Sequence, residues 1–132
     1  MIRRRHVAAA AVAIGVAIGA AIGVGVLSAD DRRPRYDLPG ASASRGRSAI
    51  ERYGCGSCHT IPGVRDARAL VGPPLTRWGE RVYVAGLLPN DPPHLVRWIM
   101  HPQSVVPGNA MPELGIAEPT ARDIAQYLYG LR

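Results

Sequence analysis

The feature that most constrains this chain is the run Cys55-Gly56-Ser57-Cys58-His59, which contains both of its cysteines. Two residues between the thiols place both sulfur atoms on one side of a tight turn, and the next side chain points to the same side. Cys-x-x-Cys-His is the attachment signature of a c-type haem, in which the thiols bond to the porphyrin and the imidazole binds the iron. The sequence therefore predicts Cys55 and Cys58 as attachment sites of one covalent haem c and His59 as an axial iron ligand.

Three other interpretations of the cysteines compete with this one. A redox dithiol is expected in a βαβ context, but no run alternates apolar and polar residues for long enough to predict such strands. A zinc site is expected to have a second pair of ligands. A structural disulfide between Cys55 and Cys58 would make the adjacent His59 coincidental.

A long apolar run precedes this motif, because residues 7–27 consist only of Ala, Val, Ile, Gly and Leu. As a helix this run is about 30 Å long, which is enough to cross a hydrocarbon core. We expect an uncleaved transmembrane anchor, since the apolar region of a signal peptide is usually about 7–15 residues long. Arg3, Arg4 and Arg5 predict that residues 1–6 are cytoplasmic and that the rest lies on the periplasmic side of a bacterial cytoplasmic membrane.

Small residues recur every four positions within this run, at Gly15, Gly19 and Gly23. Such a stripe allows another transmembrane helix to approach closely, although the abundance of glycine in the run explains it equally well. Residues 28–45 are charged and rich in Pro, Gly and Ser, so we expect a flexible tether there. The formal net charge of +6 is concentrated in the N-terminal third and does not indicate nucleic-acid binding.

Residues 46–132 have the composition of a small globular domain, and their pattern predicts three helices. One precedes Gly54, and the second begins after Asn90-Asp91, where a capping residue precedes proline, and ends before Pro102. The third covers residues 119–131, where apolar residues are spaced as on an amphipathic helix. So few helices with long loops give a thin core, which a covalent cofactor would stabilise.

The second axial ligand is expected to be Met111. It lies in Pro107-Gly108-Asn109-Ala110-Met111-Pro112, a segment that cannot form a regular helix or strand and gives no other reason for a buried thioether. The alternatives are His101, Met100 and His94, for which solvated or capping roles suffice.

Residues 46–132 as a whole resemble the class I c-type cytochromes. Beyond the Cys-x-x-Cys-His motif, the resemblance rests on Gly72-Pro73 followed by Leu75, Pro102, Pro107-Gly108 before Met111, and Tyr127-Leu128. It implies an all-α fold of about three main helices and long loops around a haem, here behind a single N-terminal transmembrane helix. It also implies the remaining haem-pocket residues: Pro73 as hydrogen-bond acceptor for His59, Arg81 and Asn109 as donors to the propionates, Trp98 near the methionine side, and Tyr83.

The segments Tyr53-Gly54-Cys55, Arg81-Val82-Tyr83 and Leu95-Val96-Arg97-Trp98-Ile99 are similar to a subset of this family. These are single-haem domains tethered to membranes or fused to subunit II of haem-copper terminal oxidases, although no copper-binding domain precedes the motif here. The implied function is a membrane-anchored monohaem carrier of single electrons between respiratory complexes, to or within a terminal oxidase, and not an enzyme by itself. Two alternatives stay open: a haem enzyme or sensor whose methionine ligand dissociates, and a non-haem membrane-complex subunit with a Cys55–Cys58 disulfide.

Overall fold

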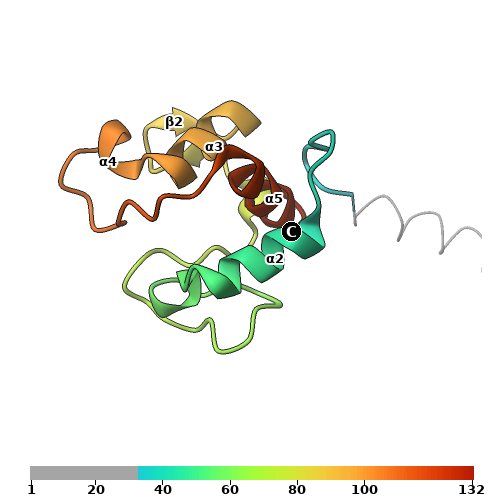
Figure 1. Ribbon diagram of the computed structural model, residues 1–132, viewed down its shortest axis with the longest axis horizontal. Coiled ribbons are helices and arrows are strands. Elements are labelled where there is room, and N and C mark those ends of the chain that lie inside the picture. Colours follow the sequence, from blue (N-terminus) through green and yellow to red (C-terminus); the bar gives the residue numbers. More distant parts are fainter. Residues whose placement is uncertain (1–32) are drawn as a thin grey trace, which may run out of the picture. The chain divides into compact units, whose positions relative to one another are not determined.

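The computed structural model describes residues 33–132 of the chain. This part contains four α-helices, two short 3₁₀ helices and one two-stranded antiparallel sheet (Figure 1). In chain order they are α2 (Ala43–Arg52), η1 (Cys55–Ser57), η2 (Trp78–Glu80), β1 (Tyr83–Val84), β2 (Leu88–Pro89), α3 (Pro92–Met100), α4 (Pro102–Val105) and α5 (Glu118–Tyr129).

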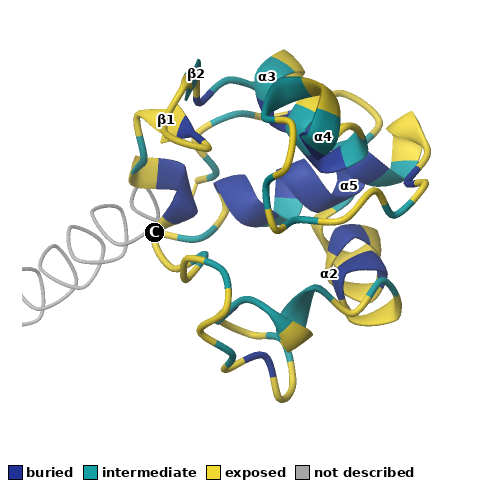
Figure 2. Cartoon of the chain, turned by 90° about the vertical axis from the view of Figure 1, so that its left-hand side faces the viewer, coloured by how far each residue is buried: buried dark blue, intermediate teal, exposed yellow. Residues whose placement is uncertain are grey.

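Helix α5 is the centre of this domain and packs against both α2 and α3. It is buried along most of its length (Figure 2), since Ala121, Ile124, Ala125 and Leu128 all have at most 4% of their surface exposed. Their spacing follows the helical repeat, so one apolar face of α5 forms the floor of the core.

Helix α2 crosses α5 at very short distance because a glycine lies at the crossing point. A Cβ atom on Gly46 would lie 1.9 Å from the carbonyl oxygen of Asp123, closer than any side chain could approach. The helix begins at Ser42, whose hydroxyl accepts a hydrogen bond from the Arg45 amide. It ends at Tyr53, before Gly54 turns the chain with a positive φ of 69°.

Residues 35–42, which we call the strap, lie along α5 and precede α2. The Leu38 amide donates to Oε1 of Gln126 at 2.7 Å, and the Ser42 amide donates to Oδ1 of Asp123 at 2.7 Å. The ring of Tyr36 meets that of Tyr129 edge-on at 4.9 Å, and Leu38 is 3% exposed. The strap thus falls within the segment for which the sequence predicts a tether, and it is bonded to the last helix of the chain.

A buried amide joins the middle of the domain to α5. Asn90 is 2% exposed, and its Nδ2 donates to the carbonyl oxygens of Trp78 and Arg81 at 3.1 and 3.0 Å. The hydroxyl of Tyr129 donates to Oδ1 of Asn90 at 3.1 Å, and burial is the main cause that raises the pKa of Tyr129. The amide nitrogen and the amide oxygen of Asn90 therefore both have hydrogen-bond partners, as burial requires.

The predicted all-α fold class is wrong for the part of the chain that the structure describes. The three predicted helices are present as α2, α3 and α5, but a fourth helix and a β-hairpin accompany them. In the hairpin Tyr83 pairs with Pro89 and Val84 with Leu88. Strands of two residues and a helix of four are too short to produce a recognisable hydrophobic period, so the sequence pattern could not reveal them.

The predicted membrane anchor, and with it the stripe Gly15, Gly19 and Gly23, lies outside the described residues. Within residues 33–132, no helix combines the length and the apolar character that a membrane crossing requires.

Candidate functional site

The Cys-x-x-Cys-His segment forms one compact turn directly after α2. The amides of Cys58 and His59 both donate to the carbonyl oxygen of Cys55, at 3.2 and 3.0 Å. Gly56 faces Ala67, and a Cβ atom at Gly56 would lie 2.8 Å from the Cβ atom of Ala67. Both thiols are free and half-buried, on the same turn as the imidazole.

Burial is the main cause that raises the pKa of the Cys55 thiol, and the neighbouring Cys58 raises it slightly further. A raised pKa keeps this thiol protonated at neutral pH, so Cys55 is a poor nucleophile by itself. Among residues 33–132, no group of three or more His, Cys, Asp and Glu side chains is arranged to hold a metal ion.

His59 is held by the loop that follows the turn. Its Nδ1 lies 2.7 Å from the carbonyl oxygen of Pro73, and since a carbonyl can only accept, Nδ1 carries the proton. The lone pair of Nε2 is then available to a metal ion, which is the usual arrangement of a histidine ligand.

Gly72 brings this loop against the imidazole ring. Its amide donates to the carbonyl oxygen of Cys58 at 2.7 Å, and a Cβ atom at this position would lie 2.4 Å from Cε1 of His59. Only glycine fits there without displacing the ring. The structure thus forms the His59–Pro73 contact that the resemblance implies, and adds Gly72, whose role depends on packing that the sequence pattern does not reveal.

Met111 is half-buried in an irregular loop that two amide side chains hold in place. Its amide donates to Oδ1 of Asn109 at 2.7 Å, and its carbonyl oxygen accepts from Nε2 of Gln103 at 2.8 Å. Nδ2 of Asn109 is occupied by the carbonyl oxygens of Pro102 and Val106, at 3.0 and 2.6 Å. In this structure Asn109 therefore stabilises the Met111 loop, instead of leaving its amide free for a cofactor.

Gln103 is a residue beside the candidate site that the sequence reasoning missed. Besides Met111, it accepts a bond from the Gly108 amide at 3.0 Å and donates to the Asn109 carbonyl oxygen at 2.9 Å. The only available signal was a glutamine next to a loop whose prolines cannot supply backbone donors. Among the described residues, no hydrogen bond joins this loop directly to the His59 turn.

Arg81 lies beside the loop that holds His59. Its guanidinium donates to the carbonyl oxygen of Pro74 and stacks over the Trp78 ring at 4.9 Å. Burial lowers the pKa of Arg81. Of the other predicted pocket residues, Tyr83 is 59% exposed at the start of β1, and Trp98 is half-buried against the core.

Trp78 is a second candidate that the sequence reasoning missed. The residue is 5% exposed, and its indole Nε1 is buried without a hydrogen-bond partner among the described residues. An unmade hydrogen bond at a buried donor costs about 1–3 kcal/mol.

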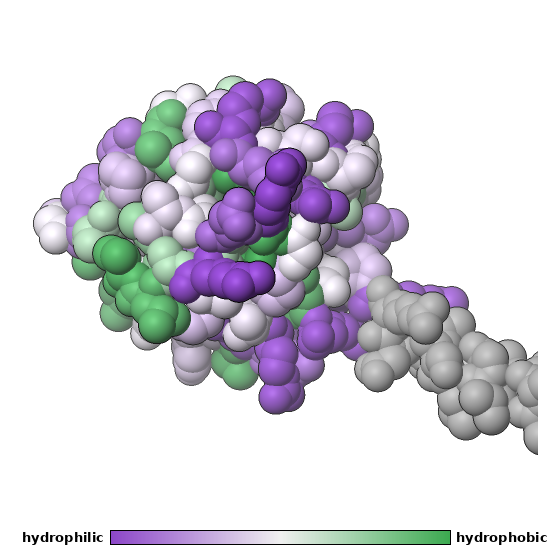
Figure 3. Space-filling view, turned by 90° about the horizontal axis from the view of Figure 1, so that it is seen from below, coloured by the Kyte–Doolittle hydropathy of each residue, from purple (hydrophilic) through white to green (hydrophobic). Residues whose placement is uncertain are grey.

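Several large apolar side chains remain at the surface near these loops: Leu70 and Val71 before Gly72, and Val82, Tyr83 and Leu87 around the hairpin. Figure 3 shows apolar side chains gathered in patches between polar ones on one face of the molecule. Protein–protein interfaces commonly have this mixed character, with apolar contact area and a polar rim.

No protein-family model matches the chain. The chain is similar to part of cytochrome c oxidase subunit 2 from three bacteria. It is 35% identical to the protein of Alkalihalophilus pseudofirmus over 107 residues, which is 80% of this chain and 29% of that protein. It is 33% identical to the Bacillus subtilis protein over 96 residues, which is 68% of this chain and 26% of that protein. For the protein of Bacillus strain PS3, the identity is 35% over 65 residues, or 48% and 18% of the two chains.

The chain therefore spans less than a third of the relatives that it matches. The similarity supports the predicted link to a terminal oxidase and to electron transfer, and it is consistent with a subunit of an oxidoreductase complex. It corrects the predicted cofactor: these relatives are named as an oxidase subunit and none as a c-type cytochrome, so the comparisons do not support an assignment of covalent haem c. This correction concerns only the covalent haem c. The sequence still contains the motif formed by Cys55, Cys58 and His59.

Proposed function

We propose that this chain is an electron-transfer module of a membrane-bound respiratory terminal oxidase, working on the outer face of the membrane. Its activity is to accept and release one electron at a single redox metal centre, without chemistry on a substrate. The similarity to part of cytochrome c oxidase subunit 2 supports the oxidase as its partner.

The metal ligands in this proposal are His59 and Met111. Imidazole nitrogen and thioether sulfur are ligands that suit iron or copper, and a thioether favours the reduced state. The order of these residues resembles that of the c-type cytochromes, which supports His59 and Met111 as a ligand pair.

The main support for this proposal is the way in which the His59 ring is held. Nδ1 of His59 lies 2.7 Å from the carbonyl oxygen of Pro73, and Gly72, which has no Cβ atom, leaves room for the ring there. This contact favours the tautomer and orientation that a metal ligand needs. A ligand that is already in place also reduces the rearrangement that accompanies each electron transfer.

Metal analysis and spectroelectrochemistry of the full chain in non-ionic detergent test this proposal. We expect one redox-active metal ion per chain, with iron and copper measured separately, and an extract in alkaline pyridine to report any porphyrin. His59→Ala should lose the metal ion or its reversible one-electron step. Met111→Leu, which preserves volume, should keep the metal ion but lower the reduction potential.

The matched controls are His101→Ala and Met100→Leu, which remove the alternative ligands. Both should leave metal content and potential unchanged. Absence of a redox metal ion, or an unchanged potential in Met111→Leu together with a changed one in Met100→Leu, would refute the proposed ligand pair.

A further inference from the structure

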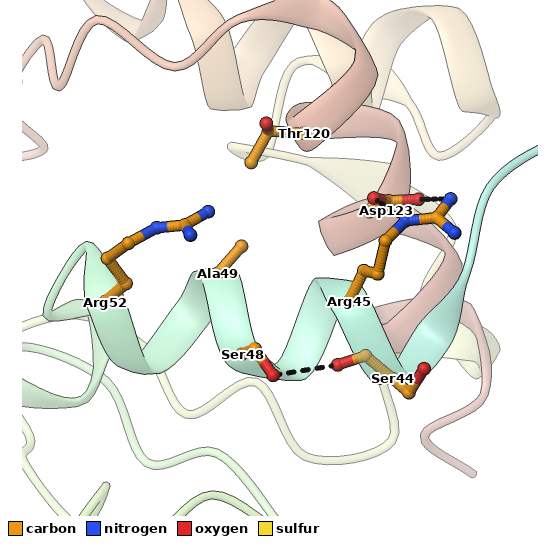
Figure 4. A pocket seen from close by; sticks show the side chains of 7 residues that line it. All are labelled: Ser44, Arg45, Ser48, Ala49, Arg52, Thr120 and Asp123. Carbon is orange, nitrogen blue, oxygen red and sulfur yellow. Dashed lines mark hydrogen bonds and ion pairs between the residues drawn. The ribbon is translucent and has the colours of Figure 1, made fainter.

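A groove of about 350 Å³ lies between α2 and α5, and none of its lining residues belongs to the candidate redox centre. Figure 4 shows that its side chains come from both helices, with Ala49 at its floor. The polar lining residues are Ser44, Arg45, Ser48 and Arg52 from α2, and Thr120 and Asp123 from α5.

The acidic group in this groove is already neutralised. Asp123 accepts from Nε and Nη2 of Arg45, at 2.7 and 2.8 Å, and from the Ser42 amide at 2.7 Å. The pKa of Asp123 is lowered, chiefly by the hydrogen bond from Arg45, so the carboxylate is ionised and paired at neutral pH. The remaining positive charge in the lining is that of Arg52.

Arg52 and Thr120 are donors for which residues 33–132 supply no acceptor. Among the described residues, the Arg52 guanidinium has no hydrogen bond or acidic partner and lies 5.5 Å from the centre of the Tyr53 ring. The Thr120 hydroxyl likewise has no hydrogen-bond partner in the described part of the chain. Figure 4 shows both side chains facing the same space above Ala49.

The position of Thr120 adds to this donor character. It lies in the first turn of α5, a helix of 12 residues whose N-cap position, Ala117, provides no side-chain hydrogen bond. Backbone amides at the start of a helix carry partial positive charge and favour an anion nearby. Ser48 contributes no further donor, because its hydroxyl donates to the carbonyl oxygen of Ser44 at 3.2 Å.

We propose that this groove is a binding site for a phosphate-type anion, either a free phosphate or the phosphodiester of a lipid headgroup. The Arg52 guanidinium provides parallel N–H donors that match two phosphate oxygens, and the Thr120 hydroxyl donates to a third. The paired Arg45 and Asp123 close one end of the groove without adding net charge.

The test uses NMR of the full chain in non-ionic detergent at constant ionic strength. One titration adds inorganic phosphate, and the other adds phosphatidylglycerol to the micelles, with phosphatidylcholine as the zwitterionic reference. The amide signals of Ala49, Arg52 and Thr120 should shift in a saturable way. Binding should weaken about fivefold to tenfold in Arg52→Gln and about threefold in Thr120→Val.

Arg97→Gln is the matched control, since Arg97 is an exposed arginine on α3, outside the groove. Saturation by phosphate alone identifies a free anion as the ligand, and saturation by phosphatidylglycerol alone identifies a lipid headgroup. Shifts that chloride reproduces, equal weakening in Arg97→Gln, or no saturation with either ligand would overturn the site. Metal content of Arg52→Gln should stay normal, so this result is independent of the proposed redox function.

Discussion

Replacing Asp123 by asparagine is the sharpest test of how the strap is held to the domain. The Asp123 side chain is 11% exposed and accepts three hydrogen bonds, one from the strap and two from Arg45. The asparagine side chain in Asp123→Asn keeps an oxygen for the Ser42 amide but loses the charge that binds the guanidinium. Hydrogen bonds to charged groups contribute about 1.5–3 kcal/mol each, but the Arg45 side chain is 60% exposed and stays hydrated, so we expect the loss to lie below this range.

The effect should depend on pH with a definite sign. The folded-state pKa of Asp123 is lowered, mainly by the hydrogen bond from Arg45. The stabilisation is therefore complete above the ordinary aspartate pKa of about 3.9, and it is lost as the pH falls through the lower folded-state value. Wild type should exceed Asp123→Asn in stability at pH 7, and the difference should shrink below about pH 4.

Chemical denaturation of the full chain in non-ionic detergent, followed by tryptophan fluorescence at pH 7, 5 and 3, measures this difference. Asp37→Asn makes the same chemical change at an exposed strap position whose carboxylate has no partner in the described part of the chain, so its stability should change by less than about 0.5 kcal/mol. Hydrogen exchange at the Ser42 amide should accelerate in Asp123→Asn. Equal stability of both variants at pH 7, or a difference that stays constant down to pH 3, would refute the reasoning.

Three further substitutions test the crossing of α2 and α5 at Gly46, the close approach of Gly72 to His59, and the hydrogen bonds that Gln103 makes to the Met111 loop. Gly46→Ala should destabilise the domain by about 3 kcal/mol, because its Cβ atom would lie 1.9 Å from the Asp123 carbonyl oxygen, whereas the exposed Ser48→Ala should have little effect in the same denaturation assay. Gly72→Ala should displace the His59 ring and reduce metal content at unchanged helicity, and Thr76→Ala serves as its control; full metal content in Gly72→Ala would contradict the proposed role of Gly72. Gln103→Leu removes three hydrogen bonds from the Met111 loop, so the methyl NMR signal of Met111 should broaden or split, and a single sharp signal would contradict this prediction.

Local signals in the sequence were sufficient to predict where α3 begins and ends. Asp91 caps α3 through the His94 amide at 3.1 Å and is followed by proline, as the predicted start requires. The uncertain feature was the start of α5, where Ala117 gives no side-chain cap. These boundaries depend on neighbouring residues, so a single sequence contains the necessary information.

The strap could not be predicted, because its partners lie far away in the sequence. Leu38 and Gln126 are 88 positions apart, and Ser42 and Asp123 are 81 positions apart. A segment rich in Pro, Gly and Ser has the composition of a tether whether or not a distant helix offers matching hydrogen-bond groups. Composition therefore predicted the solvated character of this segment but not its attachment to α5.

Proline-rich loops explain why so many polar side chains of the candidate site bond to backbone carbonyl oxygens. A proline lacks an N–H group, so such loops form few backbone hydrogen bonds and leave carbonyl oxygens that need donors. Side chains supply them here: His59 at Pro73 and Arg81 at Pro74.

Three of the predicted site residues, His59, Arg81 and Asn109, thus have a structural role that exists before any metal ion binds, because each bonds to the backbone near His59 or Met111. The sequence revealed the candidate ligands by their chemistry, but it did not reveal this mutual support, which depends on which carbonyl oxygens the folded loops leave unpaired. Replacing a donor such as Gln103 should therefore disturb the proposed centre through the backbone, even though its side chain is no ligand.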